Sequence, residues 1–118
     1  MYLVEINVRT SPDSPERTVW RLLRERKAAE KLWYQLDALT QPGMTVDDDG
    51  VSCQVLGAWV WAVDEQDRDA AIRSIDAGRA RVLKDTGNPI FEIDEEILEW
   101  IHEPLARLPP DDVVQRDV

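Results

Sequence analysis

The residues whose types could do chemistry gather on the first predicted strand. The stretch "LVEINVR", residues 3–9, alternates apolar and polar side chains, so Glu5, Asn7 and Arg9 share one face. A carboxylate can accept a proton, and a guanidinium can bind an anion. The three residues therefore form a candidate ligand site, in which Glu5 is the one weak candidate for a catalytic base. The simpler alternative is that they are ordinary polar residues on the solvent side of a strand.

Two tryptophans in "GAWVWAVD", residues 57–64, are the aromatic candidates for the same site. The polar residues Ser52 and Gln54 place the even positions of this strand outward, which predicts Trp59 and Trp61 beneath the helices. A strand this long often carries a bulge, and Gly57 is where one is expected. A bulge there would move both tryptophans to the open face, beside Glu5. The sequence leaves both arrangements open.

Other residue types with catalytic or metal-binding potential have simpler explanations. His102 is the only histidine and has no neighbouring cysteine or second histidine, so a structural or surface role is expected. The sequence "DDDG", residues 47–50, lacks the ligand spacing of a calcium loop, whereas Asp-Gly is typical of a hairpin turn. Cys53 lies in an apolar strand and is expected to be a small buried side chain. We predict no cofactor and no metal site.

The charge distribution limits the classes of macromolecule that the protein is expected to bind. A formal net charge of −10 argues against nucleic-acid binding and against anionic membrane surfaces. Residues 86–118 hold nine acidic residues against two basic ones. The simpler explanation of this excess is solvated helix surface with internal ion pairs, and the more specific hypothesis is docking on a basic protein. The candidate partner-binding residues on the last predicted helix are Glu95, Glu96, Glu99 and Trp100. The predicted basic face of the first helix comprises Arg17, Arg21, Arg24, Arg26, Lys27 and Lys31.

The elements that must position these residues follow from periodicity and from turn signals. After the first strand, Ser14-Pro15-Glu16 reads as the start of a long amphipathic helix that ends before "QPG" at 41–43. Asp64 and Asp67 read as the cap and N3 acid of a second helix, which carries apolar residues as far as Leu83. The remaining predicted elements are strands at 44–46, 51–63 and 90–93, and a helix at about 95–103 capped by Asp94. We expect one domain over residues 1–108 and a disordered tail over 109–118.

This order predicts an α+β fold of the ferredoxin-like kind. Its plan is β-α-β-β-α-β, an antiparallel sheet with two helices on one face, here with an extra C-terminal helix. The other face would keep exposed apolar surface, which usually marks an interface or a ligand cleft. We expect a homodimer through this face. The alternative is that the C-terminal helix folds back over it.

Residues 3–75 resemble the muconolactone isomerase group of dimeric α+β barrel proteins. The similar stretches are "LVEINVR", "RERKAAEKLW" and "VLGAWVWAVDEQD". The resemblance implies a ferredoxin-like protomer, oligomers built through the open sheet face, and acid–base isomerisation of a small lactone with Glu5 as the catalytic residue. The chain departs from the group after the second helix, where it lacks the His-Pro-containing tail and adds an acidic helix.

Two functional hypotheses follow. The first is a non-enzymatic, cytoplasmic protein-binding domain of the inhibitor or immunity type, acting through the apolar sheet face and the acidic C-terminal helix. The second is a small-molecule isomerase or ligand-binding barrel that uses Glu5, Asn7, Arg9 and the tryptophans. The absence of a signal peptide and of a long apolar run favours a soluble protein in either case.

Overall fold

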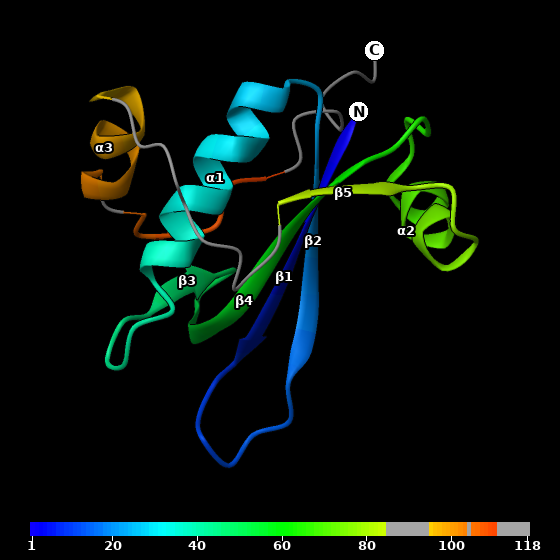
Figure 1. The fold of residues 1–118 in the computed structure, drawn as a ribbon. Helices are drawn as coiled ribbons and strands as arrows, with labels where there is room; N and C mark the ends of the chain where they lie inside the picture. The colour runs from blue at the N-terminus through cyan, green and yellow to red at the C-terminus, as the bar shows by residue number, and fades with distance from the viewer. Residues whose placement is uncertain (85–94, 104, 111–118) are drawn as a thin grey trace.

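The computed structural model describes residues 1–84, 95–103 and 105–110, and it has an α+β fold. The described residues form five strands and three helices. α3 lies beside α1, and α2 lies at the far end of the sheet (Figure 1). The predicted strand at 90–93 and its neighbour Asp94 lie outside the described residues, as do residues 111–118. The elements are β1 (Tyr2–Arg9), β2 (Arg17–Leu23), α1 (Arg26–Ala38), β3 (Val46–Asp48), β4 (Val51–Ala62), α2 (Arg68–Asp76), β5 (Arg81–Lys84) and α3 (Glu95–His102).

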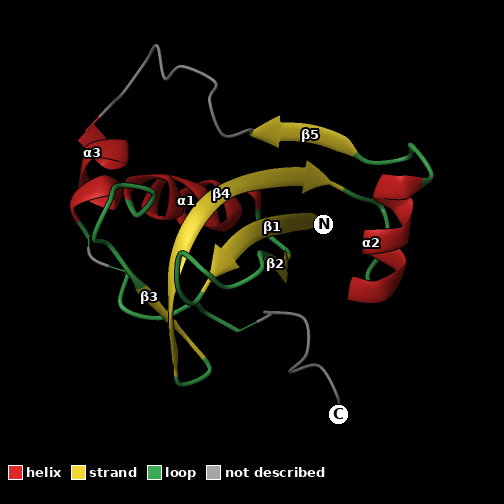
Figure 2. Ribbon diagram, turned by 90° about the horizontal axis from the view of Figure 1, so that it is seen from below, coloured by secondary structure: helices red, strands yellow, loops and turns green. Residues whose placement is uncertain are grey.

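The strands form one antiparallel sheet in the order β2-β1-β4-β3, with β5 pairing the far end of β4. The sheet is strongly curled, and β4 bends along its length (Figure 2). Because of the curl, Asp48 of β3 lies 2.9 Å from Arg17 and 3.4 Å from Arg21, although both arginines belong to β2, three places away in the sheet order. This order differs from the ferredoxin-like prediction, because the chain makes a hairpin between β1 and β2 before its first helix.

The main core lies between α1 and one face of the sheet. Val4, Ile6 and Val8 of β1 are fully buried there, as alternation along a strand requires. Trp33 of α1 is 2% exposed, and its indole N–H donates to the carbonyl of Ala58 at 2.9 Å. This hydrogen bond satisfies the one polar group of a large buried side chain, so α1 is fixed against β4.

The second helix packs on the opposite face of the sheet. Leu3 and Leu22 are neighbours across β1 and β2, and they form a separate cluster with Ala71 of α2. Because Leu3 and Val4 are adjacent in a strand, the two clusters lie on opposite sides of the sheet. The prediction of two helices on one face is therefore wrong. α2 covers only one end of its face.

Residues 17–23 were expected to be helical and instead form β2. Thr18, Trp20 and Leu22 pair with the open-face residues of β1, whereas Val19 and Leu23 join the α1 core. The preceding turn is closed by the hydrogen bond from the N–H of Ser14 to the carbonyl of Ser11, 3.0 Å long, rather than by a helix cap. Arg17 and Arg21 on β2, and Arg24 before the start of α1, therefore do not belong to a basic helix face. On α1 this face is reduced to Arg26, Lys27 and Lys31.

Among the other predicted turns and helix ends, the hairpin is confirmed and the two ends of the second helix are corrected. The hairpin between β3 and β4 is confirmed, with Asp49 and Gly50 both at positive φ, 53° and 86°. Asp67 caps α2 itself, since its carboxylate accepts from the N–H of Ala70 at 3.0 Å. α2 ends at Asp76, and Gly78 at φ 75° terminates it. Val82 and Leu83, expected on this helix, belong to β5 because the left-handed glycine releases the chain to extend.

α3 lies against α1 and not over the open face of the sheet. Trp100 packs on Tyr34 of α1, with ring centroids 6.0 Å apart. Lys27 pairs with Glu96 at 2.6 Å, and Lys31 pairs with Glu103 at 2.8 Å. The basic face of α1 and part of the acidic surface of α3 therefore neutralise one another within the molecule.

Candidate functional site

A β-bulge decides where the two tryptophans of β4 lie. Val8 pairs with Val55 and Asn7 pairs with Gly57, so Leu56 is an extra residue with no partner on β1. Before the bulge the odd residues of β4 face the α1 core, and after it the even residues do, as Ala58 and Val60 show. The prediction that the tryptophans lie beneath α1 is wrong, and the alternative with a bulge beside Gly57 is confirmed.

The sheet face away from α1 brings the predicted residues of β1 and β4 together. Glu5 is the cross-strand neighbour of Trp59 on one side and of Trp20 on the other. The indole N–H of Trp61 donates to the Glu5 carboxylate at 3.0 Å. All four of these side chains are half-buried. We call the following set the aromatic face: Glu5, Asn7, Thr18, Trp20, Trp59 and Trp61.

The polar residues farther along β1 are held by neighbours on the adjacent strands. Thr18 donates to the side-chain oxygen of Asn7 at 3.1 Å, and the Arg9 guanidinium donates to Gln54 at 3.1 Å. Glu5, Asn7 and Arg9 thus share one face, as predicted. Sequence reasoning missed Trp20 and Thr18, because their segment was interpreted as a helix. The β-branched and aromatic run Thr18-Val19-Trp20 is the signal that could have placed them on a strand.

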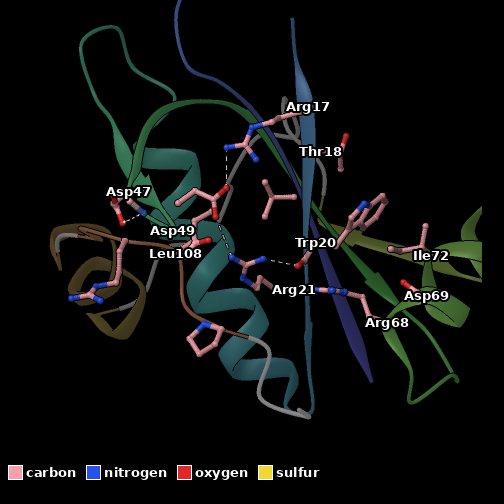
Figure 3. A pocket seen from close by; sticks show the side chains of 15 residues that line it. Arg17, Thr18, Trp20, Arg21, Asp47, Asp49, Arg68, Asp69, Ile72 and Leu108 are labelled. Carbon is pink, nitrogen blue, oxygen red and sulfur yellow. Dashed lines mark hydrogen bonds and ion pairs between the residues drawn. The ribbon is translucent and has the colours of Figure 1, made fainter. Parts of the chain in front are cut away.

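A hollow of about 790 Å³ lies along the outer edge of β2, between the β3–β4 turn, α2 and the segment 107–110. Figure 3 shows Arg17 and Arg21 on one side of β2 and Trp20 on the other, toward Ile72 of α2. The hollow therefore adjoins the aromatic face at Trp20, but Glu5 does not line it.

Two arginines and an aspartate that pair with one another line one side of this hollow. The Asp48 carboxylate accepts from both Arg17 and Arg21, and the Asp48 side chain is 12% exposed. Arg21 also donates to the carbonyls of Trp20 and Pro109. Hydrogen bonding to Asp48 raises the pKa of Arg17 above its ordinary value. These contacts join β2 and β3, the two edges of the curled sheet, and we call Arg17, Arg21 and Asp48 the clasp. The guanidinium groups of the clasp donate to partners within the molecule, which indicates a structural role.

The candidates on α3 lie apart from the aromatic face. Glu96 is in an ion pair with Lys27, and Trp100 contacts Tyr34, whereas Glu95 and Glu99 are exposed. His102 is exposed at the end of α3. Among the described residues, no group of three or more histidine, cysteine, aspartate or glutamate side chains is arranged to hold a metal ion. Cys53 is buried and free, as expected from its strand.

Comparison with protein families, with curated proteins and with solved structures finds no match to this chain. The resemblance to the muconolactone isomerase group therefore stays a prediction. In the part of the chain that the structure describes, no helix has the length and apolar character needed to cross a membrane.

Proposed function

We propose that the protein is a non-catalytic protein-binding domain that uses its aromatic face to bind a partner with a basic surface. One observation carries the proposal: Glu5 lies between Trp20 and Trp59 on the sheet face away from α1, where Trp59 belongs to neither buried cluster. Trp20 and Trp61 pack against the cluster that α2 forms and stay half-buried. Tryptophan is enriched among the residues that dominate binding energy at protein interfaces. Three half-buried tryptophans around one carboxylate supply both apolar area and a fixed charge.

The charge of the whole chain supports a basic partner. A net charge of −10 attracts a positively charged protein over several ångströms and speeds encounter. Glu95 and Glu99 on α3 are exposed and add to this field. We assign them a steering role rather than the central contact, because the neighbouring Glu96 and Trp100 already have partners within the molecule.

A second copy of the chain is the other occupant that we expected for this face. α2 rises over the end of the face that contains Leu3 and Leu22, which limits how closely a second flat sheet can approach. A two-fold axis through the centre of the face would also bring Glu5 toward its own copy, and like charges there oppose pairing. Both arguments favour a basic partner over self-association.

The isomerase hypothesis places a small substrate against Glu5. Chemistry of that kind is helped by a cavity that surrounds the substrate and excludes water. The hollow along β2 is of suitable size, but Glu5 does not line it. A protein surface laid over the aromatic face needs no such enclosure, and for this reason we favour binding over catalysis.

The test is affinity purification with the full chain from its own cells, followed by titration calorimetry with each recovered protein after recombinant production. Trp59→Ala should weaken binding of the true partner by at least about tenfold, as expected for a central interface tryptophan. Glu99→Gln is the matched surface control and should change the affinity by no more than about threefold, because a peripheral charge chiefly affects the association rate. Equal affinity of the Trp59→Ala variant and the wild type would contradict the proposal.

A further inference from the structure

The surroundings of Glu5 define a more specific chemistry than a general binding surface. In an antiparallel sheet, directly opposed side chains on one face have Cβ atoms about 4.5–5.5 Å apart. Trp20 and Trp59 are both in this relation to Glu5, one on each side. Two tryptophan residues therefore stand on either side of a single carboxylate, one on each strand next to β1.

The Glu5 carboxylate is oriented by a hydrogen bond and, among the described residues, it is not part of an ion pair. The indole N–H of Trp61 holds one oxygen of Glu5 at 3.0 Å. Within the residues that the structure describes, no lysine or arginine forms an ion pair with Glu5. Apolar neighbours shield a half-buried carboxylate from part of the surrounding water, so the attraction between it and a cation is stronger there than on an open surface.

We propose that Glu5, Trp20 and Trp59 form a receptor for the guanidinium group of an arginine on the partner protein. The inference rests on the proposed function, since it names the anchor residue by which that partner is held. A guanidinium is planar, is more weakly hydrated than an ammonium, and stacks on aromatic rings while its N–H groups donate to a carboxylate. Lysine offers a compact, strongly hydrated charge that uses flanking indoles less well.

The test follows the indole N–H signals of the ¹⁵N-labelled full chain by NMR, with the capped tripeptide acetyl-Gly-Arg-Gly-amide as the probe. Single tryptophan substitutions assign the signals. The signals of Trp20, Trp59 and Trp61 should shift with a saturable, millimolar-range dependence, while that of buried Trp33 stays fixed. A tripeptide with citrulline in place of arginine has nearly the same shape and no charge, and it should produce no saturable shift.

Two variants complete the design. Glu5→Gln keeps an oxygen that can accept from Trp61, so the fold should be retained, but the affinity for the arginine peptide should fall by about tenfold. Asp13→Asn removes the same charge from an exposed site in the turn between β1 and β2 and should leave this affinity unchanged. The Trp33 signal and the urea midpoint of each variant verify that it is folded.

Each outcome decides the matter. The inference is overturned by an absence of saturable shifts, by equal binding of the citrulline or a lysine peptide, or by a Glu5→Gln affinity equal to that of the wild type. If the arginine peptide fails to bind while Trp59→Ala still weakens binding of the full partner by at least about tenfold, only the arginine anchor is lost and the proposed function stands. If Trp59→Ala also has no effect on the partner, both are wrong.

Discussion

Asp48 shows how one residue can determine the shape of the sheet. Its carboxylate pairs with Arg17 and Arg21 across the gap between β3 and β2, and it is mostly shielded from water. Replacing it with asparagine leaves Arg21 poorly compensated in a site where its side chain is 16% exposed. We expect Asp48→Asn to lower the free energy of unfolding by about 2–3 kcal/mol, measured by urea denaturation.

The control for this variant is the next residue. Asp49 is exposed and adopts a left-handed conformation with φ 53°, which asparagine tolerates. Asp49→Asn should therefore change stability by less than about 0.5 kcal/mol. If Asp48→Asn lowers the free energy of unfolding no more than Asp49→Asn does, the clasp contributes nothing to folding.

Asp37 provides a pH-dependent prediction. Burial raises the pKa of the Asp37 carboxyl above its ordinary value of 3.8, and the residue lies in the last turn of α1, where the helix dipole also disfavours an anion. The folded state thus holds this proton more tightly than the unfolded state, so the wild type loses stability as the pH rises from 3.8 through the raised pKa. Asp37→Asn should gain about 0.3–1 kcal/mol at pH 7.

The measurement is the difference in unfolding free energy between Asp37→Asn and the wild type, determined across the pH range. The difference should shrink toward zero below pH 3.8, where the wild-type carboxyl is protonated in both states. A difference that stays constant with pH would assign the effect to something other than the charge.

Among the elements, β2 was mispredicted for a physical reason. Its two faces are both partly apolar, because Val19 and Leu23 enter the α1 core while Trp20 and Leu22 lie toward α2 and the aromatic face. Covering both faces removes the polar–apolar alternation that identifies a strand. Val19 and Leu22 are also three residues apart, as on a helix, and apolar residues at helical spacing continue into α1. The pattern therefore indicated one helix over both segments. By contrast, β1 alternates clearly and was predicted within one residue of its bounds.

The bulge of β4 provides the prediction at this scale. Deleting Leu56 leaves the pairs Val8–Val55 and Asn7–Gly57 next to one another, so every other side chain keeps its face. We expect the Leu56 deletion to fold cooperatively and to lose at most about 2 kcal/mol, the worth of one half-buried leucine. Urea denaturation followed by tryptophan fluorescence measures this.

The comparison is a deletion farther along the same strand. Removing Val60 would bring Trp61 to the fully buried position that Val60 now holds in the α1 core. Overpacking and the reversed facing of the remaining strand should cost at least about 3 kcal/mol. If the two deletions were equally damaging, Leu56 would not be an unpaired extra residue.

At the scale of the whole molecule, the sequence predicted the members of the site better than their arrangement. That Glu5, Asn7 and Arg9 share one face was predicted from alternation alone. The side of the sheet on which Trp59 lies depends on one extra residue earlier in β4, Leu56. The acidic surface of α3 was predicted, with internal ion pairs as one of its two explanations. The particular pairing of Lys27 with Glu96 was not predicted, because it depends on how two helices far apart in the chain dock. Long-range contacts of this kind have no signature in a single sequence.

The central claim is that the aromatic face is open in the isolated protein and available to a basic partner. Light scattering of the full chain at micromolar concentration tests it most directly, with Trp59→Asp measured alongside. We predict a molar mass of 13.6 kDa for both proteins at every concentration. A wild-type mass of twice that value, returning to the monomer in Trp59→Asp, would show that the face is occupied by a second copy and would contradict the account.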